Sequence, residues 1–345
     1  MTTNTGTIIM RMLFPLLWML CILTAHAQTP DSLVSVRARW CKGDTMRYQY
    51  EQAQFQVSHR DTLCTDYSCQ TMTFVVCDST DRGYLLEYVP ELTASKSPAD
   101  TARQALRSQF VGELNRLHVR FRTDRNGTVE HIDNWRQLRD SLQACLGRTL
   151  DQTYDAGAGA LMPRNRLEAL LRMEFTTEEN LRNSLEELDL LFGLHGIAAP
   201  VGQQALHPTA DYPTEGTITA SYGPYGRQGY VRDYSLLIQS RTQVPAAEAK
   251  GMADQLMDIV MADDLIGRVN HLLGGSNDDL LLNNTEEYHY FFNGWPCMVM
   301  RQQNITYGAA KTIKIKRVEW TRRSWTEPST SLQQEKNMYA ERAET

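Results

Sequence analysis

Basic clusters and long apolar runs are both scarce in this chain of 345 residues. No run of Lys or Arg is longer than two residues, and the formal net charge of −6 is mildly acidic. This composition excludes the basic stripe of a nucleic-acid-binding protein. After residue 27, no stretch approaches the roughly 18 consecutive apolar residues of a membrane helix. We therefore expect no nucleic-acid partner and no transmembrane segment once the N-terminal segment is removed.

The N-terminal segment has the pattern of a signal peptide. Residues 1–27 contain an apolar stretch of 11 residues, Leu13 to Leu23, followed by small residues at positions 25 and 27. An apolar stretch of this length before a small-x-small site is typical of a cleavable secretory signal, and it is too short to span a bilayer. The sequence predicts an exported protein, either periplasmic or secreted.

The motifs of common enzymes and metal sites are absent. The chain contains no His-Glu-x-x-His zinc motif and no Gly-x-Ser-x-Gly nucleophile turn. His59, Cys64 and Cys69 lie five residues apart, whereas paired zinc ligands usually have gaps of two to four. Adjacent acids such as Glu186 and Glu187 would point about 100° apart on a helix. We expect no cofactor, no metal and no catalytic residue, unless a hydrolase site is assembled only in three dimensions.

Cysteine is present in an even number after the signal peptide. Seven cysteines less Cys21 leave six, and an even count in an exported chain is typical of disulfides. The sequence does not determine the pairing. Cys64 and Cys69 flank a short polar segment between two strand-like runs, so we predict that these two close the end of a hairpin. The other cysteines are Cys41, Cys77, Cys145 and Cys297.

Apolar side chains recur at every second position near both ends of the predicted mature chain. Examples are Met46, Tyr48 and Tyr50; Met72, Phe74 and Val76; Tyr84, Leu86 and Tyr88; Tyr234, Leu236 and Ile238; and Tyr288 and Tyr290. Such alternation gives a strand one buried face and one wetter face, which is typical of antiparallel sheets. The apolar positions change parity between Tyr50 and Ala53 and again between Ile315 and Val318. Each change predicts a β-bulge, the first near Glu51.

Helical patterns lie between and within the strand regions. Apolar spacing predicts helices over 98–115 and 134–146, and two more between Leu167 and Phe192. Thr176 and Glu179 fit a capping box. The fold class expected is α+β, a large curved antiparallel β-sheet with helices packed on one face and a helical insert. The predicted parts are a signal peptide (1–27), an N-terminal β-rich half (28–148), a helical insert with a linker (149–215), a C-terminal β-rich half (216–320) and a loose polar tail (321–345).

Tyrosines dominate the apolar positions of the predicted strands. The candidate ligand-binding residues are Tyr48, Tyr50, Tyr84, Tyr88, Tyr234, Tyr288 and Tyr290. Aromatic residues favour strands, so a packed core explains most of them. A tyrosine hydroxyl still needs a partner or water. If helices leave this face uncovered, it forms a groove for an amphipathic ligand.

Several short motifs resemble those of a known group. The segments 42–48, 81–84, 124–135 and 294–296 resemble a loose group of uncharacterised bacterial envelope proteins that carry signal peptides. Long antiparallel sheets around helices are also similar to periplasmic lipoprotein-carrier folds. The resemblance implies no particular chemistry and transfers no functional residue.

The expected function is non-catalytic binding in the cell envelope. The main hypothesis is an apolar or amphipathic ligand, with a lipid as the expected partner. One alternative is a structural or protein-interaction module that contacts another envelope protein and has no small ligand. A second alternative is the hydrolase described above.

Overall fold

The computed structural model describes residues 33–57, 61–96, 101–155, 164–173, 175–206, 214–249 and 278–325. The predicted signal peptide, His59 and most of the polar tail lie outside the described residues.

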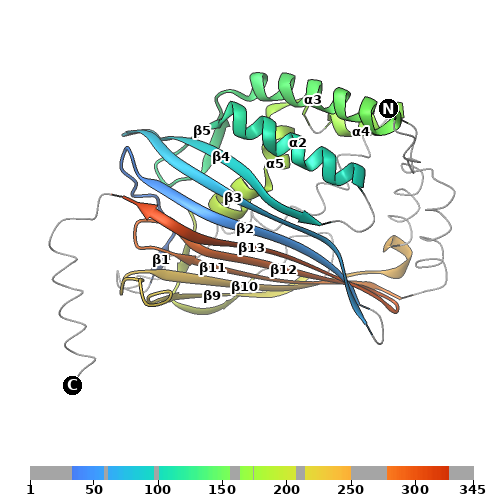
Figure 1. Ribbon diagram of the computed structural model, residues 1–345. Coiled ribbons are helices and arrows are strands. Elements are labelled where there is room, and N and C mark those ends of the chain that lie inside the picture. The colour runs from blue at the N-terminus through green and yellow to red at the C-terminus, as the bar shows by residue number, and fades with distance from the viewer. Residues whose placement is uncertain are drawn as a thin grey trace, which may run out of the picture.

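One antiparallel sheet of eleven strands dominates the fold (Figure 1). Its strand order is β6-β5-β4-β3-β2-β13-β12-β11-β10-β9-β8. The strands are β2 (Thr45–Val57), β3 (Thr62–Thr80), β4 (Gly83–Lys96), β5 (Val119–Thr123), β6 (Val129–Ile132), β8 (Gly202–Ala205), β9 (Thr214–Tyr222), β10 (Tyr234–Val244), β11 (Leu280–Tyr290), β12 (Pro296–Tyr307) and β13 (Ala310–Ser324). A separate pair joins β1 (Leu33–Ser35) to β7 (Ala198–Pro200). The N-terminal and C-terminal strands meet where β2 pairs with β13.

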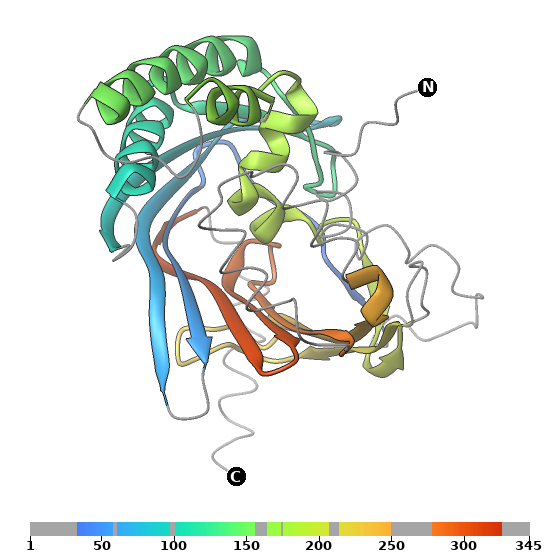
Figure 2. The same cartoon turned by 90° about the vertical axis from the view of Figure 1, so that its right-hand side faces the viewer.

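Five helices accompany the sheet, and a further helical stretch covers residues 246–249 in the described part of the chain. The five helices are α2 (Thr101–Leu117), α3 (Trp135–Asp155), α4 (Arg164–Met173), α5 (Glu178–Ser184) and α6 (Glu186–Phe192). Figure 2 shows the sheet bending around α5 and α6, which lie on its concave side. The predicted α+β class, with a large antiparallel sheet and packed helices, is confirmed.

The helix α2 runs beside β4, and α3 packs on α2. The Asn115 side chain donates a hydrogen bond of 2.9 Å to the Pro90 carbonyl, where β4 has passed the end of its pairing with β5. This contact satisfies a backbone acceptor at the sheet edge, which otherwise invites pairing with another chain.

A break separates α5 from α6. Thr177, one residue after the predicted capping position, accepts the Asn180 backbone N–H at 3.1 Å and starts α5. Leu185 then leaves helical geometry, with φ −88° and ψ 64°, before α6 begins. The break lets α6 turn toward the sheet, where five of its seven residues are buried.

The main core lies between α6 and part of the concave face. We call this part of the sheet the covered half. Its fully buried concave side chains include Met46, Tyr48, Met72, Phe74, Tyr88, Leu236, Tyr288, Val299 and Val318. Phe192 of α6 packs against Phe74 and Phe121 with ring centroids 5.4 and 5.6 Å apart. Interdigitated aromatic rings of this kind make a filled core.

The strands continue beyond this core. We call their other ends the open half: residues 51–57 of β2, 62–70 of β3, 280–286 of β11, 301–307 of β12 and 310–317 of β13. Most side chains there are half-buried on both faces. Figure 2 looks onto this end of the sheet.

The bulge predicted near Glu51 is wrong. Glu51 and Gln52 pair in unbroken register with both β3 and β13. The irregularity lies between Gln54 and Phe55, where β3 carries the extra residue. Because β2 has no inserted residue there, Ala53 and Phe55 point to the convex face, opposite to Tyr48 and Tyr50.

The second predicted bulge is also misplaced. The pairing of β13 with β2 is continuous from Ile315 to Val318, and the register shift occurs between Trp320 and Arg322. Ile315 therefore lies on the convex face and Val318 on the concave face. At both parity changes, the apolar side chains move from one face of the sheet to the other.

The predicted disulfide between Cys64 and Cys69 is wrong. Both residues belong to β3, which runs without a turn from Thr62 to Thr80. Five residues of extended strand span about 16 Å at about 3.3 Å per residue, whereas a disulfide requires Cα atoms within about 7 Å. All six cysteines after the predicted signal peptide are free thiols in the described structure. The polar segment between Cys64 and Cys69 is part of the strand and not a hairpin end.

Candidate functional site

The structure places all seven candidate tyrosines on the concave face. Six of them, Tyr48, Tyr50, Tyr88, Tyr234, Tyr288 and Tyr290, are buried, and Tyr84 is half-buried. Tyr290 stacks on Tyr234 at 5.2 Å and on Tyr288 at 6.3 Å, so three of them form one column. Tyr88 stacks on Phe74 at 4.8 Å. These rings are members of the filled core.

Most of the tyrosine hydroxyls already have partners. Tyr48 donates to the Pro296 carbonyl at 2.9 Å, and Tyr88 donates to the Glu187 carboxylate. Burial raises the pKa of Tyr48 and of Tyr88 well above the ordinary value. Tyr50 is different because its hydroxyl donates to the Gln52 side chain at 3.4 Å, at the border of the open half.

A band of polar side chains covers the concave face of the open half. Directly paired residues point to the same face, and Gln52 pairs with Lys316, which pairs in turn with Arg301. The polar band consists of Gln52, Gln54, Glu286, Arg301, Gln303, Lys314 and Lys316, all half-buried. Along β2, β12 and β13, the band begins two residues beyond the buried Tyr50, Val299 and Val318 and lies on the same face.

Arg301 is the centre of a charged network in this band. Its guanidinium lies 3.2 Å from Glu286 and 3.6 Å from Asp189 of α6, and it donates to the Tyr288 hydroxyl at 3.1 Å. The Arg301 side chain is 24% exposed and that of Glu286 only 14%. Burial raises the pKa of Asp189, and the nearby Arg301 opposes that rise.

The charges around the band nearly balance one another. Lys316 pairs with Glu186 at the start of α6. The cations Arg301, Lys314 and Lys316 thus share this region with the anions Glu186, Asp189, Glu286 and Asp66, the last of which pairs directly with Gln54. A site with balanced charge and several amides favours a ligand group that forms many hydrogen bonds without a large net charge.

An apolar corner adjoins the polar band on the same face. It consists of Val244, Leu280, Leu282, Ile305 and Tyr307 at the far ends of β10, β11 and β12. Val244 and Tyr307 are buried with Ala249 in a second, smaller core cluster. Leu282 and Ile305 pair directly and stay half-buried outside that cluster. The concave face of the open half is therefore amphipathic.

The convex face of the open half carries a separate apolar patch. This convex patch consists of Ala53, Phe55, Val57, Ile313 and Ile315, all half-buried. Phe55 pairs with Ile313 and Ala53 with Ile315 across β2 and β13. These side chains face away from the polar band.

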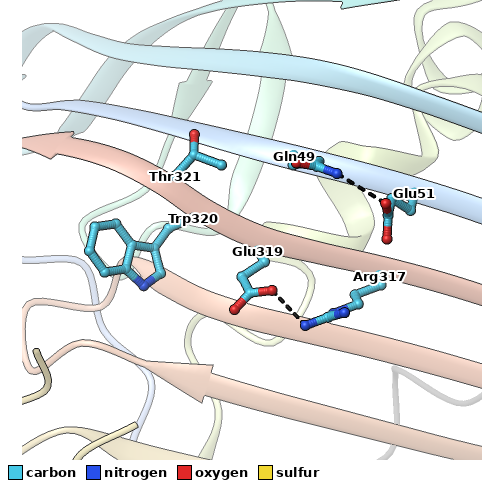
Figure 3. A pocket seen from close by; sticks show the side chains of 6 residues that line it. All are labelled: Gln49, Glu51, Arg317, Glu319, Trp320 and Thr321. Atoms are coloured by element: carbon cyan, nitrogen blue, oxygen red, sulfur yellow. Dashed lines mark hydrogen bonds and ion pairs between the residues drawn. The ribbon is translucent and has the colours of Figure 1, made fainter. Parts of the chain in front are cut away.

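A small hollow lies on the convex side of the same two strands (Figure 3). It has a volume of about 160 Å³ and is lined by Gln49, Glu51, Arg317, Glu319, Trp320 and Thr321. Sites for drug-sized ligands usually occupy about 300–1,000 Å³. Only a small molecule or one ring of a larger one fits this hollow.

Other titratable groups with shifted pKa values lie outside the hollow. Burial raises the pKa of Glu187 and raises that of Asp233 to about 6, and it lowers the pKa of His195 to about 4. None of these three residues lines the hollow of Figure 3. Within the described ranges, no group of three or more His, Cys, Asp or Glu side chains is placed to hold a metal ion.

Sequence reasoning missed the polar band and its network with α6. Glu286 is two residues from Tyr288, Arg301 two from Val299 and Lys316 two from Val318, so each continues a buried parity. Following that parity without inserting bulges would have placed all three on the concave face.

The described helices include none that is long and apolar enough to cross a membrane. No protein-family model matches the chain. No curated protein sequence matches it either.

Three solved structures give weak structural matches. A lipovitellin structure, described by its lipid–protein interactions, aligns over 85% of this chain with 10% identity and a TM-score of 0.38. The alignment covers 26% of lipovitellin, so this chain spans about a quarter of that protein's length. The attachment invasion locus protein Ail of Yersinia pestis aligns over 82% of this chain and 100% of its own, with 5% identity and a TM-score of 0.15.

The third match is an outer membrane channel from Pseudomonas putida F1. It aligns over 86% of this chain and 100% of its own, with 8% identity and a TM-score of 0.15. These TM-scores are all too low to assign a function.

Proposed function

We propose that this is an exported, non-catalytic protein that binds an amphipathic molecule on the concave face of the open half. The observation that carries the proposal is the amphipathic character of that face, where the polar band lies beside the apolar corner. The export prediction supports a role in the cell envelope, because the segment 1–27 has the pattern of a secretory signal.

The two parts of the face suit the two parts of such a ligand. The half-buried Leu282 and Ile305 offer apolar surface to a short acyl chain or ring, at roughly 25 cal/mol for each Å² removed from water. Gln303 and Gln54 offer amide donors and acceptors to a polar head. Because the surrounding charges nearly balance, with one anion in excess, a zwitterionic or hydroxylated head is favoured over a strongly anionic one.

The candidate tyrosines have an indirect part in this proposal. Tyr288 orients Arg301, and Tyr50 borders the polar band through Gln52. Tyr48, Tyr84, Tyr88, Tyr234 and Tyr290 support the sheet from the core side. We therefore place the ligand beyond the tyrosine column and not against it.

The test is a binding titration of residues 28–345 with a fluorescent lysophosphatidylcholine, a zwitterionic lipid with one acyl chain. We expect saturable binding that Ile305→Gln weakens about tenfold, because it removes roughly 1.4 kcal/mol of apolar contact. The matched control is Asn304→Gln, which changes the neighbouring residue on the convex face. A fluorescent fatty acid of the same chain length should bind more weakly because its head is anionic.

Two outcomes would contradict the proposal. One is the absence of saturable binding to either lipid. The other is equal binding by the Ile305→Gln and Asn304→Gln proteins when urea unfolding shows that both are folded. Loss of binding on Phe55→Gln instead would assign the contact to the convex patch and favour the protein-interaction alternative.

A further inference from the structure

The hollow of Figure 3 combines one aromatic wall with a polar rim. In the pairing of β2 with β13, Gln49 lies opposite Glu319 and Glu51 lies opposite Arg317. These four side chains occupy neighbouring positions on the convex face, and Figure 3 shows the Trp320 indole at one end of them. The rim stands on the two central strands of the sheet, which gives it a rigid support.

Contacts within the rim hold its side chains in place. Gln49 donates to Glu51 at 3.0 Å, and Arg317 donates to Glu319 at 2.6 Å. The Tyr67 hydroxyl also donates to Glu51, at 3.4 Å. Groups positioned before binding lose less conformational entropy when a ligand arrives.

The Trp320 indole also contacts other side chains of the protein. Phe291 meets the Trp320 ring edge-on with centroids 5.6 Å apart, and the Arg323 guanidinium lies 5.2 Å from the same ring. Arg323 in turn lies within 5.4 Å of the rings of Tyr230, Phe291 and Trp325. This packing sets the orientation of the aromatic wall.

The chemistry of the lining disfavours several ligand classes. Five of its six side chains are polar, which disfavours an apolar ligand. An anion would meet the two carboxylates Glu51 and Glu319. The two carboxylates would attract a cation, but the Arg317 guanidinium would repel it, and a cation offers no acceptor to the rim.

We infer that the hollow binds one ring of a neutral saccharide. Each hydroxyl of a pyranose is both donor and acceptor, so adjacent hydroxyls match a rim that presents carboxylates beside a guanidinium, an amide and the Thr321 hydroxyl. The C–H face of the ring is apolar and suits the indole. The volume of about 160 Å³ suits a single ring. This site is on the opposite face of the sheet from the proposed lipid site and does not depend on it.

The test is saturation-transfer NMR on residues 28–345 with the methyl glycosides of glucose, galactose and N-acetylglucosamine. We expect ring-proton signals from at least one glycoside and binding about tenfold weaker in Gln49→Ala/Glu51→Ala, which removes one side of the rim. Gln302→Ala, on the convex face of β12 outside the hollow, should bind as the unchanged protein does. If a trisaccharide shows saturation transfer at one terminal ring only, the natural ligand is the end of a glycan and not a free monosaccharide.

Three results would overturn the inference. They are the absence of signal from every glycoside, equal binding by the Gln49→Ala/Glu51→Ala and Gln302→Ala proteins, and displacement of the glycoside by phenyltrimethylammonium or inorganic phosphate at lower concentration. Urea unfolding of both variants shows whether a loss of signal reflects unfolding, and Trp320→Phe, which keeps an aromatic wall, should bind more weakly without losing the signal.

Discussion

The covered and open halves of one sheet have opposite polarity. Under α6, the concave face is apolar and the convex face carries polar residues such as Arg47 and Gln49. In the open half, the concave face carries the polar band and the convex face carries Phe55 and Ile313. The same strands run through both halves without a bulge on β2 at the transition. The position of α6, and not the alternation of a strand, determines which face is buried.

The largest expected difference between the halves is in the free energy of unfolding that is lost when one phenylalanine of each half is replaced by alanine. Phe74 is fully buried among four aromatic rings, so Phe74→Ala should lower the free energy of unfolding by about 4 kcal/mol. Phe55 in the convex patch is half-buried, and Phe55→Ala should cost about 1 kcal/mol. Urea denaturation measures both. Equal losses would show that the open half is packed as tightly as the covered half.

The core of the covered half should also respond to acid through His195. Burial lowers the pKa of His195 from 6.5 to about 4. Between those pH values the unfolded chain binds a proton that the folded chain does not, so stability falls as the pH falls from 6.5 to 4. The loss is about 3 kcal/mol for the full shift.

His195→Gln isolates this contribution. The glutamine amide retains a donor for the Gly294 carbonyl, which the histidine ring contacts at 3.0 Å. Urea unfolding between pH 7 and pH 4 should show a smaller loss of stability for the variant than for the unchanged protein. Parallel pH profiles would mean that His195 titrates normally in the folded chain.

Smaller effects should separate two arginines on adjacent strands. Arg301→Met leaves Glu286 and Asp189 without their cation in a half-buried site and should cost about 2 kcal/mol. Arg317 is 47% exposed and pairs with Glu319 on the convex face, so Arg317→Met should cost less than about 1 kcal/mol. Thermal unfolding of the two variants compares them. A larger loss for Arg317 would contradict the position of Arg301 at the centre of the charged network.

The sequence was sufficient to predict the covered half. Tyr48 lies between Arg47 and Gln49, and the apolar residues around Phe74 and Tyr88 recur at every second position. A helix covers one face of these strands and the other face is wetter, which is the pattern of an antiparallel strand. The α+β class followed from such local signals.

The open half could not be predicted in the same way. A parity change at Ala53 is equally consistent with an inserted residue and with a reversal of the apolar face, and only the register with neighbouring strands distinguishes the two. The same reversal misled the interpretation of the segment between Cys64 and Cys69. Its polar residues belong to a strand whose concave face is wet, and they do not form a turn.

The central claim is that an amphipathic ligand occupies the concave face of the open half. Native isoleucines report on both faces: Ile305 is concave, whereas Ile313 and Ile315 are convex. Methyl NMR of isoleucine-labelled protein with a lysophosphatidylcholine that carries a spin label on its acyl chain compares them directly. We predict strong broadening of the Ile305 methyl signal with Ile313 and Ile315 unaffected. Broadening of Ile313 and Ile315 while Ile305 stays sharp would contradict the proposal.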